Sequence, residues 1–421
     1  MQPKSLLYKN NYWLLVLEGT FFMGTVGFYN ANTVLPVFID TMTHSKQLVG
    51  LTLTLGSLFM YLSRLFIGPF MPHVQNNARF AAKLMFSARP LLLLPAFFIF
   101  AGLDKLSVIV LIAAYVAFWI CDGMVVPSWS EVLTNTIDEN RHGRLLGWQM
   151  LLGSSAGIGA GVIINIFLAS PKLEAKFAYG WVFLIGGIFA TLSCVMMALT
   201  KNAPQTYKSG KVDFWGYFKE LPKYLKNEKD YTRMMIVQFL FLSASMCLPF
   251  IILFSSDNLE IPQNIIAKLI LIQSIGTPLG GWLWGYINDR IGSHNGLRLA
   301  GLNLILPAAL PLLTLFFHGI PPQLIMYPVM FLAGLSGGIW TCYYMYTIQV
   351  VRPESRSACL VLSSVITLPT AFTGYIAGYI AESFGFVPLF TICIVLVLSG
   401  VVFALRLRSV KIVKEEREHN N

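Results

Sequence analysis

The chain alternates between long apolar stretches and short polar segments along almost its whole length. A membrane-spanning helix needs about 17–25 mostly apolar residues. Twelve stretches meet this condition: residues 12–38, 48–71, 82–102, 106–130, 145–168, 178–199, 233–255, 265–287, 297–317, 323–347, 357–381 and 385–406. Helices are expected because a backbone in lipid has to satisfy its own hydrogen bonds, and the alternating pattern of barrel strands is missing. The pattern predicts an all-α integral membrane protein with twelve transmembrane helices.

The spans form two sets of six, separated by the only long polar stretch of the sequence. A weak repeat relates the sets, since Asp-Glu-Asn-Arg precedes the fifth span and Pro-Glu-Ser-Arg precedes the eleventh. Aromatic residues within the polar stretch can form one apolar face of a helix at the membrane surface; a solvated linker is the alternative. The predicted domains are a six-helix bundle at 1–199, a cytoplasmic linker with this amphipathic helix at 200–232, a second six-helix bundle at 233–407 and a cytoplasmic tail at 408–421.

Charge is scarce and unevenly placed. Of the 421 residues, 56% are apolar and 12% are charged, whereas an average soluble domain has about 25% charged residues. This composition argues against a soluble enzyme, a coiled coil and a disordered chain. With the N-terminus inside, 24 of the 30 Lys and Arg residues fall on the cytoplasmic side and five on the other. This follows the positive-inside rule and predicts a multi-pass protein of the cell membrane with both termini cytoplasmic. Because the basic residues are scattered among short loops, no nucleic-acid partner is expected.

The remaining chemistry-bearing residues argue against catalysis. All six cysteines lie within apolar stretches without a C-x-x-C pair, and the six histidines lie in loops or in the tail. Neither a disulfide framework nor a metal site or other cofactor is expected, and no enzymatic activity is predicted. A G-x-x-x-x-G-K-[ST] phosphate loop is missing as well, so the chain is not expected to be driven by ATP.

Ionisable residues at membrane depth stand out because each costs about 2.5–3.5 kcal/mol at a helix centre. At 1.5 Å per residue, Glu18 lies roughly 9 Å inside the cytoplasmic boundary when counted from Tyr12, Asp122 roughly 9 Å from Ser128, and Arg64 roughly 12 Å from Pro72. We expect these three residues to form a switchable charge network in which one carboxylate exchanges a proton. The alternatives are a static ion pair and snorkelling of Glu18 to the interface.

Two further charges in the N-terminal half receive other interpretations. Glu131, near the cytoplasmic end of its span, is expected to pair with Arg141 or Arg144 as a gate or loop partner. Arg89 is, like Arg64, a possible partner of the intramembrane acids, but it directly precedes Pro90 and is therefore expected at the membrane interface.

Uncharged polar and aromatic residues within the spans are candidates for substrate binding. An apolar pocket with a few amides and hydroxyls suits a neutral, amphiphilic or aromatic small molecule. Plain helix packing or an interfacial aromatic belt is the alternative. The candidates are Tyr29, Asn30, Asn32, Trp119, Gln149, Gln238, Gln273, Trp340, Tyr343, Tyr344 and Thr347.

The segment after the eighth span reads G-Y-I-N-D-R-I-G, from Gly285 to Gly292. Its pattern G-x-x-x-D-R-x-G resembles the signature loop of the major facilitator superfamily. The resemblance implies a gate role for Gly285, Asp289, Arg290 and Gly292, and for Arg356 in the repeated segment before the eleventh span. The corresponding loop of the first half departs from the family, with Pro72 and His73 where the family has Asp and Arg.

Glycines recur every four residues in the fifth span, at Gly153, Gly157 and Gly161. This spacing gives one flat helix face for close packing. It also resembles the antiporter motif G-x-x-x-G-P-x-x-G-G of drug–proton exchangers, although Ile158 and Val162 occupy its proline and last glycine positions.

The layout and the resemblance together predict a monomeric secondary transporter that moves a small molecule by rocking its two halves. Its expected partners are the small-molecule substrate, protons and membrane lipid, and export is favoured. The alternatives are a proton symporter or facilitator for nutrient uptake, a lipid flippase and a non-transporting membrane sensor.

Overall fold

The structure is a computed structural model that describes residues 4–67, 70, 74–137, 139–170, 173–201, 223, 225, 228–315, 320–352 and 356–419. Its regular elements in these residues are all helices. The predicted surface helix within 200–232 falls almost wholly outside the described residues.

Contacts divide the chain into two compact units, which are described separately. Unit 1 comprises Met1–His44 and Thr52–Val212, and unit 2 comprises Ser45–Leu51 and Asp213–Asn421. The assignment of Ser45–Leu51 to unit 2 splits one continuous helix between the units, which the sequence did not indicate. Unit 1 contains α1 (Lys4–Phe28), α2 (Val34–Thr43), most of α3 (Lys46–Ile67), α4 (Asn77–Ala88), the 3₁₀ helix η2 (Arg89–Leu93), α5 (Leu94–Phe100), α6 (Asp104–Thr136), α7 (Glu139–Leu168) and α8 (Ala175–Leu199).

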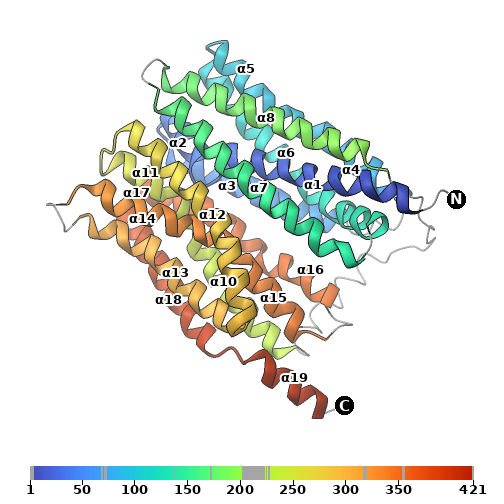
Figure 1. Cartoon of the computed structure of the whole chain (residues 1–421). Helices are drawn as coiled ribbons and strands as arrows, with labels where there is room; N and C mark the ends of the chain where they lie inside the picture. Colours follow the sequence, from blue (N-terminus) through green and yellow to red (C-terminus); the bar gives the residue numbers. More distant parts are fainter. Residues whose placement is uncertain are drawn as a thin grey trace. The chain divides into compact units, whose positions relative to one another are not determined.

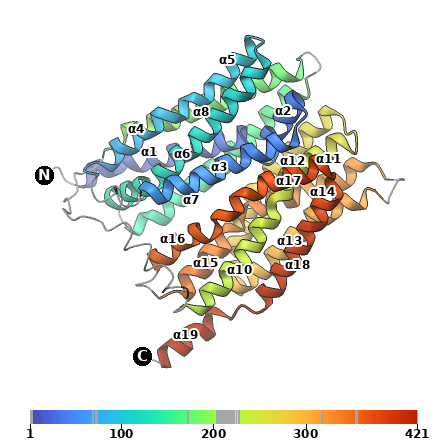
Figure 2. The same cartoon turned by 180° about the vertical axis from the view of Figure 1, so that it is seen from behind.

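In unit 1, α1 lies against α7 and α8, and α4 lies against α6 and α8 (Figures 1 and 2). The α1–α7 contact uses small residues on both sides. A Cβ atom on Gly27 would lie 3.1 Å from the Cβ of Ala160 and 3.4 Å from the Cα of Gly157. Gly153 faces the side chain of Met23. The glycine-rich face of the fifth predicted span therefore packs against the first.

Two predicted spans of unit 1 are broken. The first, 12–38, is divided between α1 and α2 by a turn in which the main-chain N–H of Asn32 donates to the side-chain oxygen of Asn30 over 2.8 Å. The third breaks after α4, where Ala88 leaves the helical region with φ of −126° and Pro90 has no N–H to donate. The chain passes through η2 before α5 resumes the helix.

Unit 2 contains α10 (Lys229–Ala244), η3 (Ser245–Cys247), α11 (Leu248–Asp257), α12 (Gln263–Ile291), α13 (Ser293–Leu313), α14 (Pro322–Leu335), η4 (Ser336–Gly338), α15 (Trp340–Val350), α16 (Arg356–Thr367), η6 (Leu368–Phe372), α17 (Thr373–Ser383), α18 (Phe386–Leu405) and α19 (Val410–His419). Helix α12 packs against α14, and α18 packs against α10 and α13. The three short 3₁₀ segments interrupt the seventh, tenth and eleventh predicted spans.

Eleven helical segments in the described part of the chain are long and apolar enough to cross a membrane, and α2 is a shorter apolar helix. The first predicted span, formed by α1 and α2, completes the series of twelve. The predicted fold class, an all-helical membrane protein of two six-helix sets, is confirmed. Several helices extend beyond their apolar stretches. Helix α6, for example, continues to Thr136 although the predicted span ends at 130.

Polar side chains of α10 and α13 contact the chain where α18 ends. The guanidinium of Arg298 donates to the carbonyls of Ala404, Leu405 and Leu407, at and just beyond the C-terminus of α18. Arg408 forms a two-point contact with Asp230, at 2.9 and 2.6 Å. These bonds fix the chain just before α19.

The close contact of α12 with α14 generates a test of the packing. A Cβ atom on Gly280 would lie 2.3 Å from the main-chain oxygen of Leu335, whereas one on the adjacent Gly281 would meet nothing within 4 Å. We expect Gly280→Ala to destabilise the protein by about 1–3 kcal/mol because backbone atoms would have to move apart. Gly281→Ala, the matched control, should leave stability unchanged or raise it by up to about 1 kcal/mol through helix propensity. Thermal unfolding of the purified protein in detergent measures both, and equal midpoints for the two variants would contradict the close packing.

Candidate functional site

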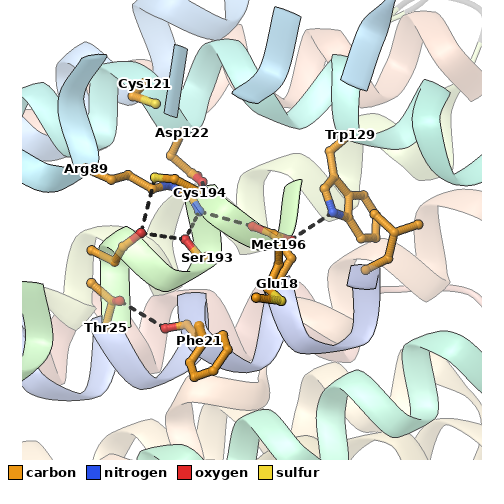
Figure 3. Close-up of polar contacts among 12 residues, drawn as sticks. Glu18, Phe21, Thr25, Arg89, Cys121, Asp122, Trp129, Ser193, Cys194 and Met196 are labelled. Atoms are coloured by element: carbon orange, nitrogen blue, oxygen red, sulfur yellow. Dashed lines mark hydrogen bonds and ion pairs between the residues drawn. The ribbon is translucent and has the colours of Figure 1, made fainter. Parts of the chain in front are cut away.

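A buried charge cluster lies inside unit 1 and consists of Glu18, Arg89 and Asp122 (Figure 3). Nη1 of Arg89 donates to Oε1 of Glu18 over 3.1 Å, and Nη2 lies 3.7 Å from Oδ1 of Asp122. The three residues are 4%, 1% and 8% exposed, respectively. One arginine thus stands between two carboxylates in the interior of the helical unit.

Three different elements bring these side chains together. Glu18 lies on α1, 14 residues from the helix start, and Asp122 lies on α6, 14 residues from the helix end. Both positions are about 21 Å along the helix from those termini. Arg89 is the first residue of η2, so the break that Pro90 imposes on the third span lies at the cluster.

Two neutral residues complete the hydrogen bonding of the cluster. Nε1 of Trp129 on α6 donates to Oε2 of Glu18 over 3.0 Å. Ser193 on α8 accepts a hydrogen bond from Nη1 of Arg89 over 2.6 Å and donates its own proton to the carbonyl of Ala190. Figure 3 shows Trp129 and Ser193 on opposite sides of the Glu18–Arg89 contact. Neither residue is among the sequence predictions.

Aromatic rings cover the guanidinium. The Cζ atom of Arg89 lies 5.0 Å from the ring centre of Phe22 and 5.8 Å from that of Phe118, and the two rings are stacked on each other. Such cation–π contacts strengthen when water is excluded. They help to explain how a guanidinium is accommodated at a position closed to water.

The charges of the cluster do not balance. With all three groups ionised, two carboxylates and one guanidinium leave an excess negative charge in a medium of low dielectric constant, where unpaired charge is costly. The excess can be removed by one proton or by the approach of another cation. This property distinguishes the cluster from a simple buried ion pair.

Arg89, and not Arg64, forms the ion pairs with the two carboxylates of the cluster. The expectation that Arg89 lies at the membrane interface is wrong, because its side chain is buried and paired with Glu18. Arg64, on α3, is half-buried and interacts electrostatically with Asp122. Within the described residues it forms no ion pair with Glu18 or Asp122, and its Nε has no hydrogen-bond partner.

The predicted gate residues are only partly described. Glu131 is exposed on α6 and accepts a hydrogen bond from Asn135, while the side chains of Arg141 and Arg356 lie outside the described part of the chain. In the motif after the eighth span, Asp289 and Arg290 are exposed, and Arg290 lies over the ring of Tyr286 at 5.4 Å. Gly292 joins α12 to α13 with φ of +86°, a conformation that glycine adopts without strain.

The candidate substrate residues of unit 1 mostly contact the protein itself. The hydroxyl of Tyr29 is hydrogen-bonded to main-chain carbonyls of η2 and α8. Asn30 stabilises the turn between α1 and α2, and Asn32 lies half-buried in that turn. Nε2 of Gln149 donates to the carbonyl of Leu15 over 3.2 Å. Trp119 differs, since its buried Nε1 has no hydrogen-bond partner in the described structure.

The candidates of unit 2 separate into buried and exposed residues. Gln273 on α12 is buried, and its Oε1 has no hydrogen-bond partner among the described residues. Gln238 is half-buried on α10. On α15, Tyr343 and Thr347 are buried, and the hydroxyl of Thr347 donates to the main-chain carbonyl of Tyr343. Trp340 and Tyr344 are exposed, with their ring centres 6.4 Å apart.

The described residues contain no group of three or more His, Cys, Asp or Glu side chains that could hold a metal ion. They do form an open groove of about 450 Å³ between α3 and α6. Its lining consists only of aliphatic residues: Leu55, Ile109, Ile112, Ala113, Val116, Ala117 and Ile120.

Solved structures with a similar fold are transport proteins. A bacterial homologue of the human lysosomal transporter Spinster, in an inward-facing and unoccupied conformation, has a TM-score of 0.59 and 15% identity over 97% of this chain and 96% of its own. The nucleoside transporter NupG has a TM-score of 0.62 and 13% identity over 95% of this chain and 98% of its own. A D-xylose–proton symporter has a TM-score of 0.69 and 11% identity over 96% and 98%. Comparison with curated protein sequences gives no match.

The sequence profile of the Major Facilitator Superfamily matches residues 17–361 and 234–420, which together cover nearly the whole chain. This match agrees with the resemblance seen in the segment from Gly285 to Gly292 and with the two sets of six spans. The chain belongs to the Major Facilitator Superfamily and is a secondary transporter that works by alternating access.

Proposed function

We propose that the protein is a proton-coupled exporter of a small neutral or amphiphilic molecule. It acts as a monomer in the cell membrane, with both termini cytoplasmic as the Lys and Arg distribution favours. The buried charge cluster of unit 1 is the proton-binding site, and its protonation state biases the equilibrium between the two access states.

The unequal charge count of the cluster is the observation that carries this proposal. Glu18 and Asp122 compete for one buried guanidinium. Opening a transporter to one side of the membrane admits water, and closing it removes water, so the energy of the excess charge differs between the states. A carboxylate that takes up a proton in one state and releases it in the other links proton movement to the conformational change.

The proposed substrate class follows from what the charged groups already contact. The described carboxylates and guanidinium of the cluster pair with one another, and a charged substrate would have to compete with these partners. Uncharged groups retain free hydrogen-bonding capacity, namely Nε1 of Trp119 and Oε1 of Gln273. Amides, indoles and aromatic rings suit a neutral or amphiphilic molecule.

Export rests on the glycine spacing of α7, which resembles the antiporter motif except at Ile158 and Val162. Proton symport is the second candidate, because a D-xylose–proton symporter has the same fold along nearly the whole chain. A lipid flippase is less well supported, since the groove between α3 and α6 is lined by aliphatic side chains only.

The coupling role can be tested by neutralising each carboxylate. A panel of ligands scored by thermal stabilisation first identifies a substrate, because binding raises stability by RT ln(1 + [L]/Kd).

In proteoliposomes, Glu18→Gln and Asp122→Asn should each abolish substrate accumulation driven by a pH gradient and retain part of the counterflow exchange. Asp104→Asn, a change at an exposed carboxylate on the same helix as Asp122, should behave as the unaltered protein. Gradient-driven accumulation that survives in both cluster variants would refute the coupling role.

The direction of coupling is read from the sign of the response. An inwardly directed proton gradient should drive the substrate out of preloaded proteoliposomes if the protein is an antiporter, whichever way it is inserted. Uptake of external substrate under the same gradient would replace export by symport. A substrate flux equal to the flux without a gradient would exclude both proton antiport and proton symport.

A further inference from the structure

We propose that the two carboxylates of the cluster have different tasks: Asp122 takes up and releases the proton, and Glu18 stays ionised as the permanent counter-ion of Arg89. This division rests on the proposed proton-coupled function and identifies the atoms that carry it. In the exchange step only the O–H bond of the Asp122 carboxyl group forms or breaks. The proton comes from water on one side of the membrane and returns to water on the other.

Both oxygens of Glu18 are already engaged by groups that can only donate. Oε1 accepts from Nη1 of Arg89 over 3.1 Å, and Oε2 accepts from Nε1 of Trp129 over 3.0 Å. A proton on either oxygen would weaken both hydrogen bonds, because a neutral acid accepts more weakly than a carboxylate. It would also leave the buried guanidinium without its nearest counter-ion.

Asp122 is held much more loosely. Its carboxylate forms no hydrogen bond with the described residues, and its one ion pair spans 3.7 Å. Its side chain keeps 11% of its surface exposed, against 5% for Glu18 and 2% for Arg89. Asp122 can therefore bind a proton or contact water without breaking a hydrogen bond. When it is protonated, Glu18 and Arg89 remain as a neutral pair.

The charged and titratable groups around Asp122 come from every neighbouring element. Glu18 on α1 and Arg89 on η2 face it within the cluster, and Arg64 on α3 interacts with it electrostatically. The thiols of Cys121 on α6 and Cys194 on α8 lie beside Arg89 and donate to main-chain carbonyls. Arg64 is the one cation of this set that has no ion pair among the described residues. Ionisation of Asp122 therefore attracts Arg64, and protonation weakens this attraction.

Neutralising Glu18 does not separate the two carboxylates. In Glu18→Gln, Asp122 becomes the only carboxylate beside Arg89 and is held ionised, so proton exchange is lost there as well. Variants that keep both carboxylates separate the roles. Trp129→Phe removes a donor from Glu18 alone, and Arg64→Gln removes a cation that interacts with Asp122.

The experiment follows the carbonyl stretch of protonated carboxylic acids by infrared difference spectroscopy, during a pH titration of the full-length protein in lipid nanodiscs. The band that disappears in Asp122→Asn is the band of interest. Asp122→Glu should shift its frequency, and Glu18→Asp should not. Arg64→Gln should move its midpoint to higher pH by about tenfold in proton affinity, because a nearby cation no longer stabilises the carboxylate. Trp129→Phe should change that affinity by less than about threefold, since its partner does not titrate.

The opposite pattern would overturn the assignment. A band that shifts in Glu18→Asp and whose midpoint moves in Trp129→Phe, but not in Arg64→Gln, would make Glu18 the proton carrier and leave the coupling proposal intact. If no cluster carboxyl group titrates in the unaltered protein, both the division of tasks and the proton coupling fail. Size-exclusion profiles and circular dichroism of each variant identify any that misfold, and Asp122→Glu then carries the comparison.

Discussion

A buried guanidinium has to be paired, and the interior of unit 1 is arranged around that requirement. Arg89 lies where lipid-like surroundings would make an isolated cation prohibitively unstable. Pro90 breaks the third span at this point, Glu18 and Ser193 accept hydrogen bonds from the guanidinium, and two aromatic rings cover its face. Asp122 is the member that this pairing does not require. A cluster that is stable without its last charge can gain or lose that charge, and this is the physical basis for the proposed proton site.

The spans and two of the three cluster residues were predictable from sequence, because hydropathy reports which residues enter the membrane and at what depth. Arg89 is a possible partner of the acids by sequence, but the interface is favoured for it because a residue before proline commonly marks the end of a helix. It lies seven residues inside the predicted span that begins at 82, roughly 11 Å at the helical rise. The same counting placed Glu18 and Asp122 at roughly 9 Å. The depth of Arg89 in its span therefore indicated a buried position, but a proline inside a span is equally consistent with a kink in the helix and with its end.

The direction in which polar side chains point could not be predicted in the same way. Tyr29, Asn30 and Gln149 have the composition of binding residues, and yet their polar atoms contact main-chain groups of unit 1. An amide or hydroxyl in a span always needs a partner, and only the packing of several helices decides whether that partner is protein or ligand. Trp129 illustrates the converse. It resembles an ordinary interfacial aromatic in the sequence, but it completes the hydrogen bonding of Glu18.

The weak sequence repeat relates the helix order of the two halves, but the buried charged residues of the described structure are not repeated. In the described part of unit 2, the buried acids Glu228 and Asp230 lie at the beginning of α10, where Asp230 pairs with Arg408 beyond α18. Glycines bring the backbones of α12 and α14 together in this unit, as small residues join α1 and α7 in unit 1. The charge cluster therefore distinguishes unit 1 and favours it as the unit in which the proposed proton binds.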